Sequence, residues 1–98
     1  MSLMNPKIYK FHATIQKVSD QDGAYIIVPL DIKKEFSKGR VAVHATFDNE
    51  PYDGNIVNMG LKHHDGSTCY IIGIRKDIRS KIKKQPGDII KVTIKEKE

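Results

Sequence analysis

The pattern that decides the fold occurs twice, as Phe11-His12-Ala13-Thr14-Ile15 and as Tyr52-Asp53-Gly54-Asn55-Ile56. In each copy an aromatic residue, a small residue and an isoleucine alternate with more polar residues. This period of two is typical of a β-strand with one buried face. We therefore expect two equivalent strands, one in each half of the chain.

Further matches follow each copy in the same order. The first half continues with the loop Asp20-Gln21-Asp22-Gly23 and then Tyr25-Ile26-Ile27, and the second with Asp65-Gly66 and then Tyr70-Ile71-Ile72. Aspartate followed by glycine favours the tight turns that join antiparallel strands. Each half is therefore predicted to begin with a β-hairpin.

A short helix and a last strand complete each half. Asp31 is a suitable N-cap for a first helix that Gly39 would close, and isoleucines at every fourth position predict a second helix over residues 74–82. Alternating apolar residues then predict strands at residues 41–47 and 90–94. The order of elements in both halves is β-β-α-β.

Each half needs a partner, because it has an apolar sheet face and exposed strand edges. Two units are too few for a solenoid, which needs at least about three stacked repeats. We expect a mainly β fold in which halves at about residues 8–47 and 52–96 are related by a pseudo-twofold duplication. The predicted result is a closed or nearly closed barrel of about six strands with two short helices.

Length and composition limit the possible functions. A chain of 98 residues predicts one domain, here residues 4–98, with little room for a deep catalytic cavity. Met1-Ser2-Leu3 resembles an expression leader. The single cysteine, Cys69, excludes an intramolecular disulfide and a multi-thiolate zinc site, and it fits the reducing cytoplasm. No apolar run approaches the roughly 18 residues that cross a bilayer, so no membrane partner is expected.

The chain resembles a small prokaryotic family, the domain of unknown function number nineteen-oh-five. The resemblance rests on the order of six features: Phe11-His12-Ala13-Thr14-Ile15, Gly23 to Pro29, Gly39-Arg40-Val41-Ala42-Val43, the Asp48 to Tyr52 turn, Arg79, and Pro86 to Val92. It implies a double-split β-barrel, the fold that AbrB-like regulators and MazE-like antitoxins form from two chains. The resemblance brings no established activity, cofactor or catalytic residue. The sequence departs from the family pattern in two loops, at Asn49-Glu50 and at Lys83-Lys84-Gln85.

A basic segment lies at the second predicted helix. The chain has a net charge of +5, and six positive charges fall within residues 75–84, beside the apolar stripe of Ile74, Ile78 and Ile82. This pattern predicts a helix with one packed face and charged remaining faces. The candidate anion-binding residues are Arg75, Lys76, Arg79, Lys81, Lys83, Lys84 and, in the first half, Arg40.

The leading hypothesis is a non-enzymatic binding module for an anionic partner, with nucleic acid as the first partner to test. Phosphate contacts would make such binding weaken steeply with salt. The competing interpretation is a solvated amphipathic helix without a ligand. A base-stacking platform is not expected, since every aromatic residue except Tyr9 occupies a core-facing or repeat-equivalent position.

A second hypothesis is a small-molecule or catalytic site in the groove between the halves. No catalytic residue is assigned, because neither Ser67 nor Cys69 lies in a recognisable nucleophile motif. No metal or cofactor is expected, because adjacent histidines on an extended chain point to opposite faces. A third hypothesis is a protein-interaction domain, present as a monomer or weak homodimer. The candidate groove residues are His12, Tyr25, His44, His63 and His64.

Overall fold

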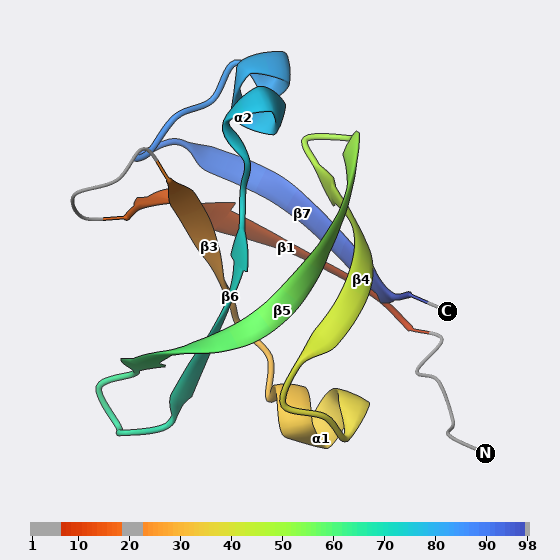
Figure 1. Ribbon diagram of the computed structural model, residues 1–98, viewed down its shortest axis with the longest axis vertical. Coiled ribbons are helices and arrows are strands. Elements are labelled where there is room, and N and C mark those ends of the chain that lie inside the picture. Colours follow the sequence, from red (N-terminus) through yellow and green to blue (C-terminus); the bar gives the residue numbers. More distant parts are fainter. Residues whose placement is uncertain (1–6, 19–22, 98) are drawn as a thin grey trace.

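The computed structural model describes residues 7–18 and 23–97 (Figure 1). The expected leader Met1-Ser2-Leu3 and the Asp20 to Asp22 part of the first hairpin loop lie outside these residues. In chain order the elements are β1 (Ile8–Thr14), β2 (Gln16–Lys17), β3 (Ala24–Val28), α1 (Ile32–Phe36), β4 (Val41–Phe47), β5 (Glu50–Lys62), β6 (Thr68–Gly73), α2 (Lys76–Ile82) and β7 (Ile89–Glu96).

All strands belong to one antiparallel sheet in the order β1-β7-β4-β5-β6-β3-β2. The sheet curls into a half-barrel, and α1 and α2 lie at its opposite ends (Figure 1). The expectation of a mainly β fold with two short helices is confirmed. Within the described residues, no helix is long and apolar enough to cross a membrane.

The expectation of a closed or nearly closed barrel of about six strands is confirmed only in part, because the curved sheet is a half-barrel that does not close. The structure has seven strands within its described residues, because the first predicted strand divides at Ile15. β1 pairs with β7, whereas β2 pairs with β3, so the two pieces stand at the two ends of the sheet. Only Ile15 separates β1 from β2 along the chain, so the two strands follow one another and do not pair. No ladder therefore joins the ends of the half-barrel in the part of the chain described.

The core is formed by the inward residues of every strand. Ile72 of β6 lies opposite Ile26 of β3 on one side and Ile56 of β5 on the other. All three side chains are fully buried. Cross-strand pairs of this kind are the unit of sheet stabilisation. This row therefore binds the middle of the sheet to its β3 end.

Caps define the two helices. Asp31 accepts a hydrogen bond from the Lys34 N–H at 3.2 Å, as expected for an N-cap. The left-handed residue that ends α1 is Ser37, with φ 58°, and not the expected Gly39. The last helical hydrogen bond runs from Ser37 N–H to Lys33 O, so the helix ends before Gly39. Lys83 has the same role after α2, with φ 57°.

The loop after α1 is attached to the sheet through a buried carboxylate. Glu96 faces inward near the end of β7 and is 2% exposed. Lys38, just after α1, donates from Nζ to Glu96 Oε2 at 2.5 Å. A buried charge needs such a partner, because burial without one is costly. The pair thus holds the α1 end of the molecule against β7.

Truncation of the central isoleucine tests the importance of the buried row. We expect Ile72→Ala to lower the free energy of unfolding by about 2–5 kcal/mol, since it leaves a cavity between β3 and β5. Urea unfolding measures this loss. Ile89→Ala is the control, because Ile89 is 61% exposed and its truncation should change stability by less than about 0.5 kcal/mol. Equal losses for both variants would contradict the described core.

Candidate functional site

A shallow groove runs along α2 and the turn that follows it. It has a volume of about 420 Å³ and is lined by Lys76, Arg79, Ser80, Lys83, Lys84 and Gln85. Four of the seven cations predicted from the sequence therefore share one groove. Ser80 and Gln85 were not among the residues predicted from the sequence. Helical spacing could have indicated Ser80, which follows Lys76 by four positions.

Packing fixes the orientation of α2. Ile74 and Ile78 are buried in the core, as the apolar stripe predicted. Arg75, just before the helix, lies over the Tyr52 ring at 5.1 Å from its centroid. Tyr52 in turn packs against Phe47 with ring centroids 5.4 Å apart. A Cβ on Gly54 would come within 2.6 Å of Tyr52 Cε2, so the glycine makes room for this ring.

Carboxylates of the β4–β5 turn hold the far side of the helix. Lys81 Nζ lies 3.3 Å from Glu50 Oε1, and Lys84 Nζ lies 3.9 Å from Asp48 Oδ2. Exposed pairs of this kind contribute about 0–1 kcal/mol each. Within the described residues, Lys83 makes no ion pair, and its exposed side chain stands at the rim of the groove. The basic segment is therefore only partly neutralised by the protein itself.

Three predicted cations lie outside the groove: Lys81, which pairs with Glu50, and Arg75 and Arg40. Arg75 forms an ion pair with Asp77, with Nε and Oδ1 3.3 Å apart, in addition to its contact with Tyr52. Arg40 is exposed and directly precedes β4, next to α1. Because α1 and α2 lie at opposite ends of the half-barrel (Figure 1), Arg40 does not join the α2 cations.

The structure does not assemble the predicted groove between the halves. His12 of β1 and His44 of β4 are exposed on the outer face of the sheet, opposite Lys91 and Lys95 of β7. Tyr25 is half-buried on β3. Sheet order puts β7 between the two histidines and two strands, β5 and β6, between His44 on β4 and Tyr25 on β3. These residues do not form one site.

His44 has an acidic partner on the same outer face. Its Nδ1 lies 2.7 Å from Asp53 Oδ1, and the two residues are directly opposed on β4 and β5. The hydrogen bond from His44 is the main cause that lowers the pKa of Asp53 below its ordinary value of 3.8, and Lys97 adds to it. This pair is an electrostatic contact on an open surface rather than part of an enclosed pocket.

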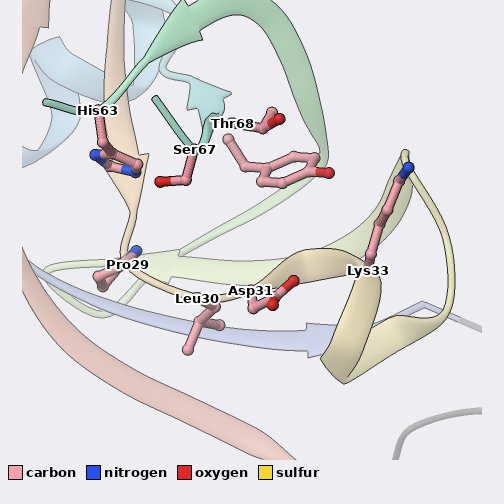
Figure 2. Close-up of a pocket in the computed structure, with 8 residues that line it drawn as sticks. Pro29, Leu30, Asp31, Lys33, His63, Ser67 and Thr68 are labelled. Atoms are coloured by element: carbon pink, nitrogen blue, oxygen red, sulfur yellow. The ribbon is translucent and has the colours of Figure 1, made fainter. Parts of the chain in front are cut away.

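His63 does line a cleft, which lies between the β5–β6 turn and the chain that enters α1 (Figure 2). In Figure 2, His63, Ser67 and Thr68 form one wall, and Pro29, Leu30 and Asp31 lie across from them. The cleft has a volume of about 490 Å³, within the size range of small-molecule sites. Its lining residues are Pro29, Leu30, Asp31, Lys33, His63, Ser67, Thr68 and Tyr70.

The β5–β6 turn is a closed hydrogen-bonded loop. His63 N–H donates to Ser67 O at 2.9 Å, and Gly66 N–H donates to His63 O at 2.9 Å. Ser67 donates to Asp65 Oδ1 from both its N–H, at 2.9 Å, and its Oγ, at 2.6 Å. The Ser67 hydroxyl is thus engaged with a carboxylate. These two hydrogen bonds are the main causes that lower the pKa of Asp65 below 3.8.

Two other groups weighed for chemistry have clear positions. Cys69 is 3% exposed, which fits a small buried apolar side chain. His64 and His63 border a second shallow hollow together with Ile27, Lys62 and Cys69. Among the described residues, no three histidine, cysteine, aspartate or glutamate side chains are grouped so that they could hold a metal ion.

The hydrogen bonds of the β5–β6 turn predict how Asp65 titrates. Replacement of Ser67 by alanine removes the hydroxyl donor, so the pKa of Asp65 should rise toward 3.8. In the natural chain, the stabilisation from this carboxylate is present at neutral pH and lost as the pH falls through the lowered pKa. Carboxyl-carbon NMR measures the shift. Ser80→Ala, far from the turn, is the control, and an unchanged Asp65 titration in Ser67→Ala would refute the assignment.

Comparison with known proteins places this architecture in a family. A search of curated proteins finds no match to the chain. The family model described as Domain of unknown function (DUF1905) matches residues 11–94. The match begins within β1, ends within β7 and includes both helices. The chain therefore belongs to the family described as Domain of unknown function (DUF1905).

Proposed function

We propose that this domain is a non-enzymatic module that binds the phosphates of nucleic acid in the groove along α2. Lys76, Arg79, Lys83 and Lys84 line that groove together with the hydroxyl-bearing Ser80. Lysine, arginine and serine side chains are typical donors to phosphate oxygens. The net charge of +5 also favours an anionic partner.

The observation that most supports this proposal is the backbone of Lys83. Its φ of 57° lies in the left-handed region, where glycine is common after a helix and a residue with a Cβ is disfavoured by about 1–2 kcal/mol. A cation near a helix C-terminus regains only about 0.3–1 kcal/mol. A lysine at this position therefore lowers the stability of the fold relative to a glycine. The same lysine places its side chain at the groove. Such strain at a non-glycine residue favours a functional role.

The kind of cation suggests how the nucleic acid would be bound. Three of the four groove cations are lysines, which act as point charges, whereas base recognition favours the planar fork of arginine. We therefore expect contacts to the phosphate backbone with little dependence on base sequence. Binding of this type releases counterions and weakens linearly in log–log plots against salt.

Fluorescence anisotropy with a labelled random-sequence DNA duplex tests the function. We expect a Kd on the order of 1–100 µM near physiological salt and much tighter binding at about 50 mM salt. A polyglutamate chain of similar charge is the comparison, and it should bind more weakly because it lacks phosphate oxygens. Absence of duplex binding at about 100 µM protein and low salt would refute the proposal.

Substitutions at the two left-handed helix ends separate stability from binding. Lys83→Gly should raise the free energy of unfolding by about 0.5–1 kcal/mol, because it relieves the left-handed strain, and should weaken duplex binding. Ser37→Gly, at the equivalent position after α1, should stabilise similarly and leave binding unchanged. Lys83→Gln should weaken binding without the stabilisation. Equal affinities of Lys83→Gly, Lys83→Gln and the natural chain would count against the groove.

A small-molecule site is the second candidate function. The cleft beside α1 favours it, because an imidazole, three hydroxyl groups, a carboxylate and an ammonium group line a volume of about 490 Å³. A polar metabolite with apolar contact to Leu30 would suit this lining. A thermal-shift screen of small polar metabolites, followed by NMR of His63, tests it. Unchanged melting temperatures throughout would argue against this site.

We also propose that the half-barrel is a duplicated, double-split arrangement similar to AbrB-like and MazE-like barrels. The pattern of strand pairing stays the same when the strands of one half are interchanged with their equivalents in the other half, which supports this proposal. The pairing of β1 with β7 corresponds to that of β5 with β4, and the pairing of β2 with β3 corresponds to that of β5 with β6.

The single, buried Cys69 favours a cytoplasmic location. A monomer or weak homodimer, and a role in protein interaction, remain further proposals that gel filtration and pull-down test.

A further inference from the structure

A second group of cations lies on the outer face of β1 and β7. Lys10 of β1 and Lys91 and Lys95 of β7 are exposed and alternate with inward residues of the core. Lys10 is directly opposite Thr93. It therefore lies between Lys91 and Lys95 across the ladder, where diagonal neighbours are about 7–8 Å apart. The register brings together three lysines from the two ends of the sequence.

The protein does not neutralise these three lysines. In the part of the chain described, none of their side chains makes an ion pair or a hydrogen bond. Two carboxylates border the same face, and both are already engaged. Asp53 pairs with His44 and with Lys97, whose Nζ lies 3.5 Å from Asp53 Oδ2. Asp48 Oδ1 accepts a hydrogen bond from the backbone N–H of Lys91 at 2.8 Å.

Asp48 also connects this face to the groove along α2. Its Oδ2 lies 3.9 Å from Lys84 Nζ, and its own N–H donates to Lys91 O at 2.8 Å. The Lys84 side chain lines the groove, whereas the Lys91 side chain belongs to the outer face. Asp48 is therefore in contact with one residue of each basic region, so the two regions lie next to each other.

The geometry points to a nucleic-acid duplex that is bound by this whole surface, from the α2 groove across the outer face of β1 and β7. This inference rests on the proposed function and extends it to a second set of contacts. Lysines beside the exposed Thr14 supply the ammonium and hydroxyl donors that bind phosphate oxygens, whereas the Thr93 hydroxyl is already hydrogen-bonded to Thr46 Oγ1.

An anionic lipid surface is the alternative that the test must exclude. Ile8 and Ile89 are exposed on the same face, but they lie toward opposite ends of the β1–β7 ladder. They therefore do not form one apolar patch for insertion, and single exposed isoleucines are common on soluble proteins. The lysines between them favour the repeated phosphates of a nucleic-acid backbone.

A charge-matched pair of triple variants tests the inference. Lys10→Gln/Lys91→Gln/Lys95→Gln removes the cations of the outer face, and Lys34→Gln/Arg40→Gln/Lys62→Gln removes three exposed cations from elsewhere. We expect the first to weaken duplex binding at least about tenfold at low salt and to reduce the slope of log Kd against log salt by about 3. The second should leave the slope unchanged. Urea unfolding should show that neither variant is less stable than the natural chain, because all six substituted side chains are exposed.

The outcomes separate this inference from the proposed function. If the natural chain does not bind duplex, both fail. If the natural chain binds duplex, and if Lys83→Gln weakens this binding whereas the outer-face triple variant does not, then only the present inference is overturned. Tighter binding to phosphatidylserine vesicles than to duplex also overturns it. Independently of any variant, addition of duplex to the natural chain should shift the amide NMR signals of Lys10, Lys91 and Lys95 together with those of α2, and shifts confined to α2 would refute it.

Discussion

The structure depends on how Ile15 is held. This residue is buried between β1 and β2, and it exchanges two backbone hydrogen bonds with the segment before β7. Its N–H donates to Asp88 O at 2.8 Å, and Gly87 N–H donates to its carbonyl at 2.9 Å. Gly87 adopts φ 99°, which a residue with a side chain rarely adopts. Because β1 and β2 follow one another across Ile15 and stand at the two ends of the sheet, the sheet must curve to bring its ends together. The core lies inside the half-barrel that this curvature creates.

The same contacts place the basic surface. The turn that contains Lys83 and Lys84 leads directly into Gly87 and Asp88, and Ile15 holds those two residues. β7 then begins with its register against β1 already set, so the position of Lys91 relative to Lys10 is determined by the ladder. The groove along α2 and the lysines of the sheet are therefore parts of one rigid arrangement. A backbone that is already held by hydrogen bonds loses less freedom on binding than a mobile loop does.

Much of this arrangement is predictable from local patterns. Alternation in residues 41–47 and at Ile90, Val92 and Ile94 predicted two strands with the correct buried faces, and Asp31 was identified as a helix cap. The same alternation shows why the histidine groove was wrong. His12 and His44 each lie between two inward-facing neighbours, so their side chains must point outward. This alternation is visible in the sequence, and it is a better guide to the position of the two side chains than their shared residue type.

Other features have no local signal. Nothing near Ile15 indicates a change of strand partner, because its apolar side chain continues the alternation of β1. The left-handed turn at Lys83 lacks the glycine that usually identifies it. By contrast, β5 extends beyond Ile56 to Lys62 through the alternating apolar residues Val57, Met59 and Leu61, a local signal that was not used for the prediction. The outer lysines come together only through a register between residues about 80 positions apart, which no local pattern determines.

The distribution of counter-charges divides the lysines of this region into two groups. Asp48, Glu50 and Asp53 engage Lys84, Lys81 and Lys97 at the β4–β5 side of the molecule. Lys10, Lys83, Lys91 and Lys95 have no such partner within the described residues, although some of these acids lie close by. Mutual repulsion among unneutralised lysines opposes folding, and salt or a bound polyanion relieves it. A polyanion that binds only the folded state would therefore stabilise the domain most at low salt, where this repulsion is strongest.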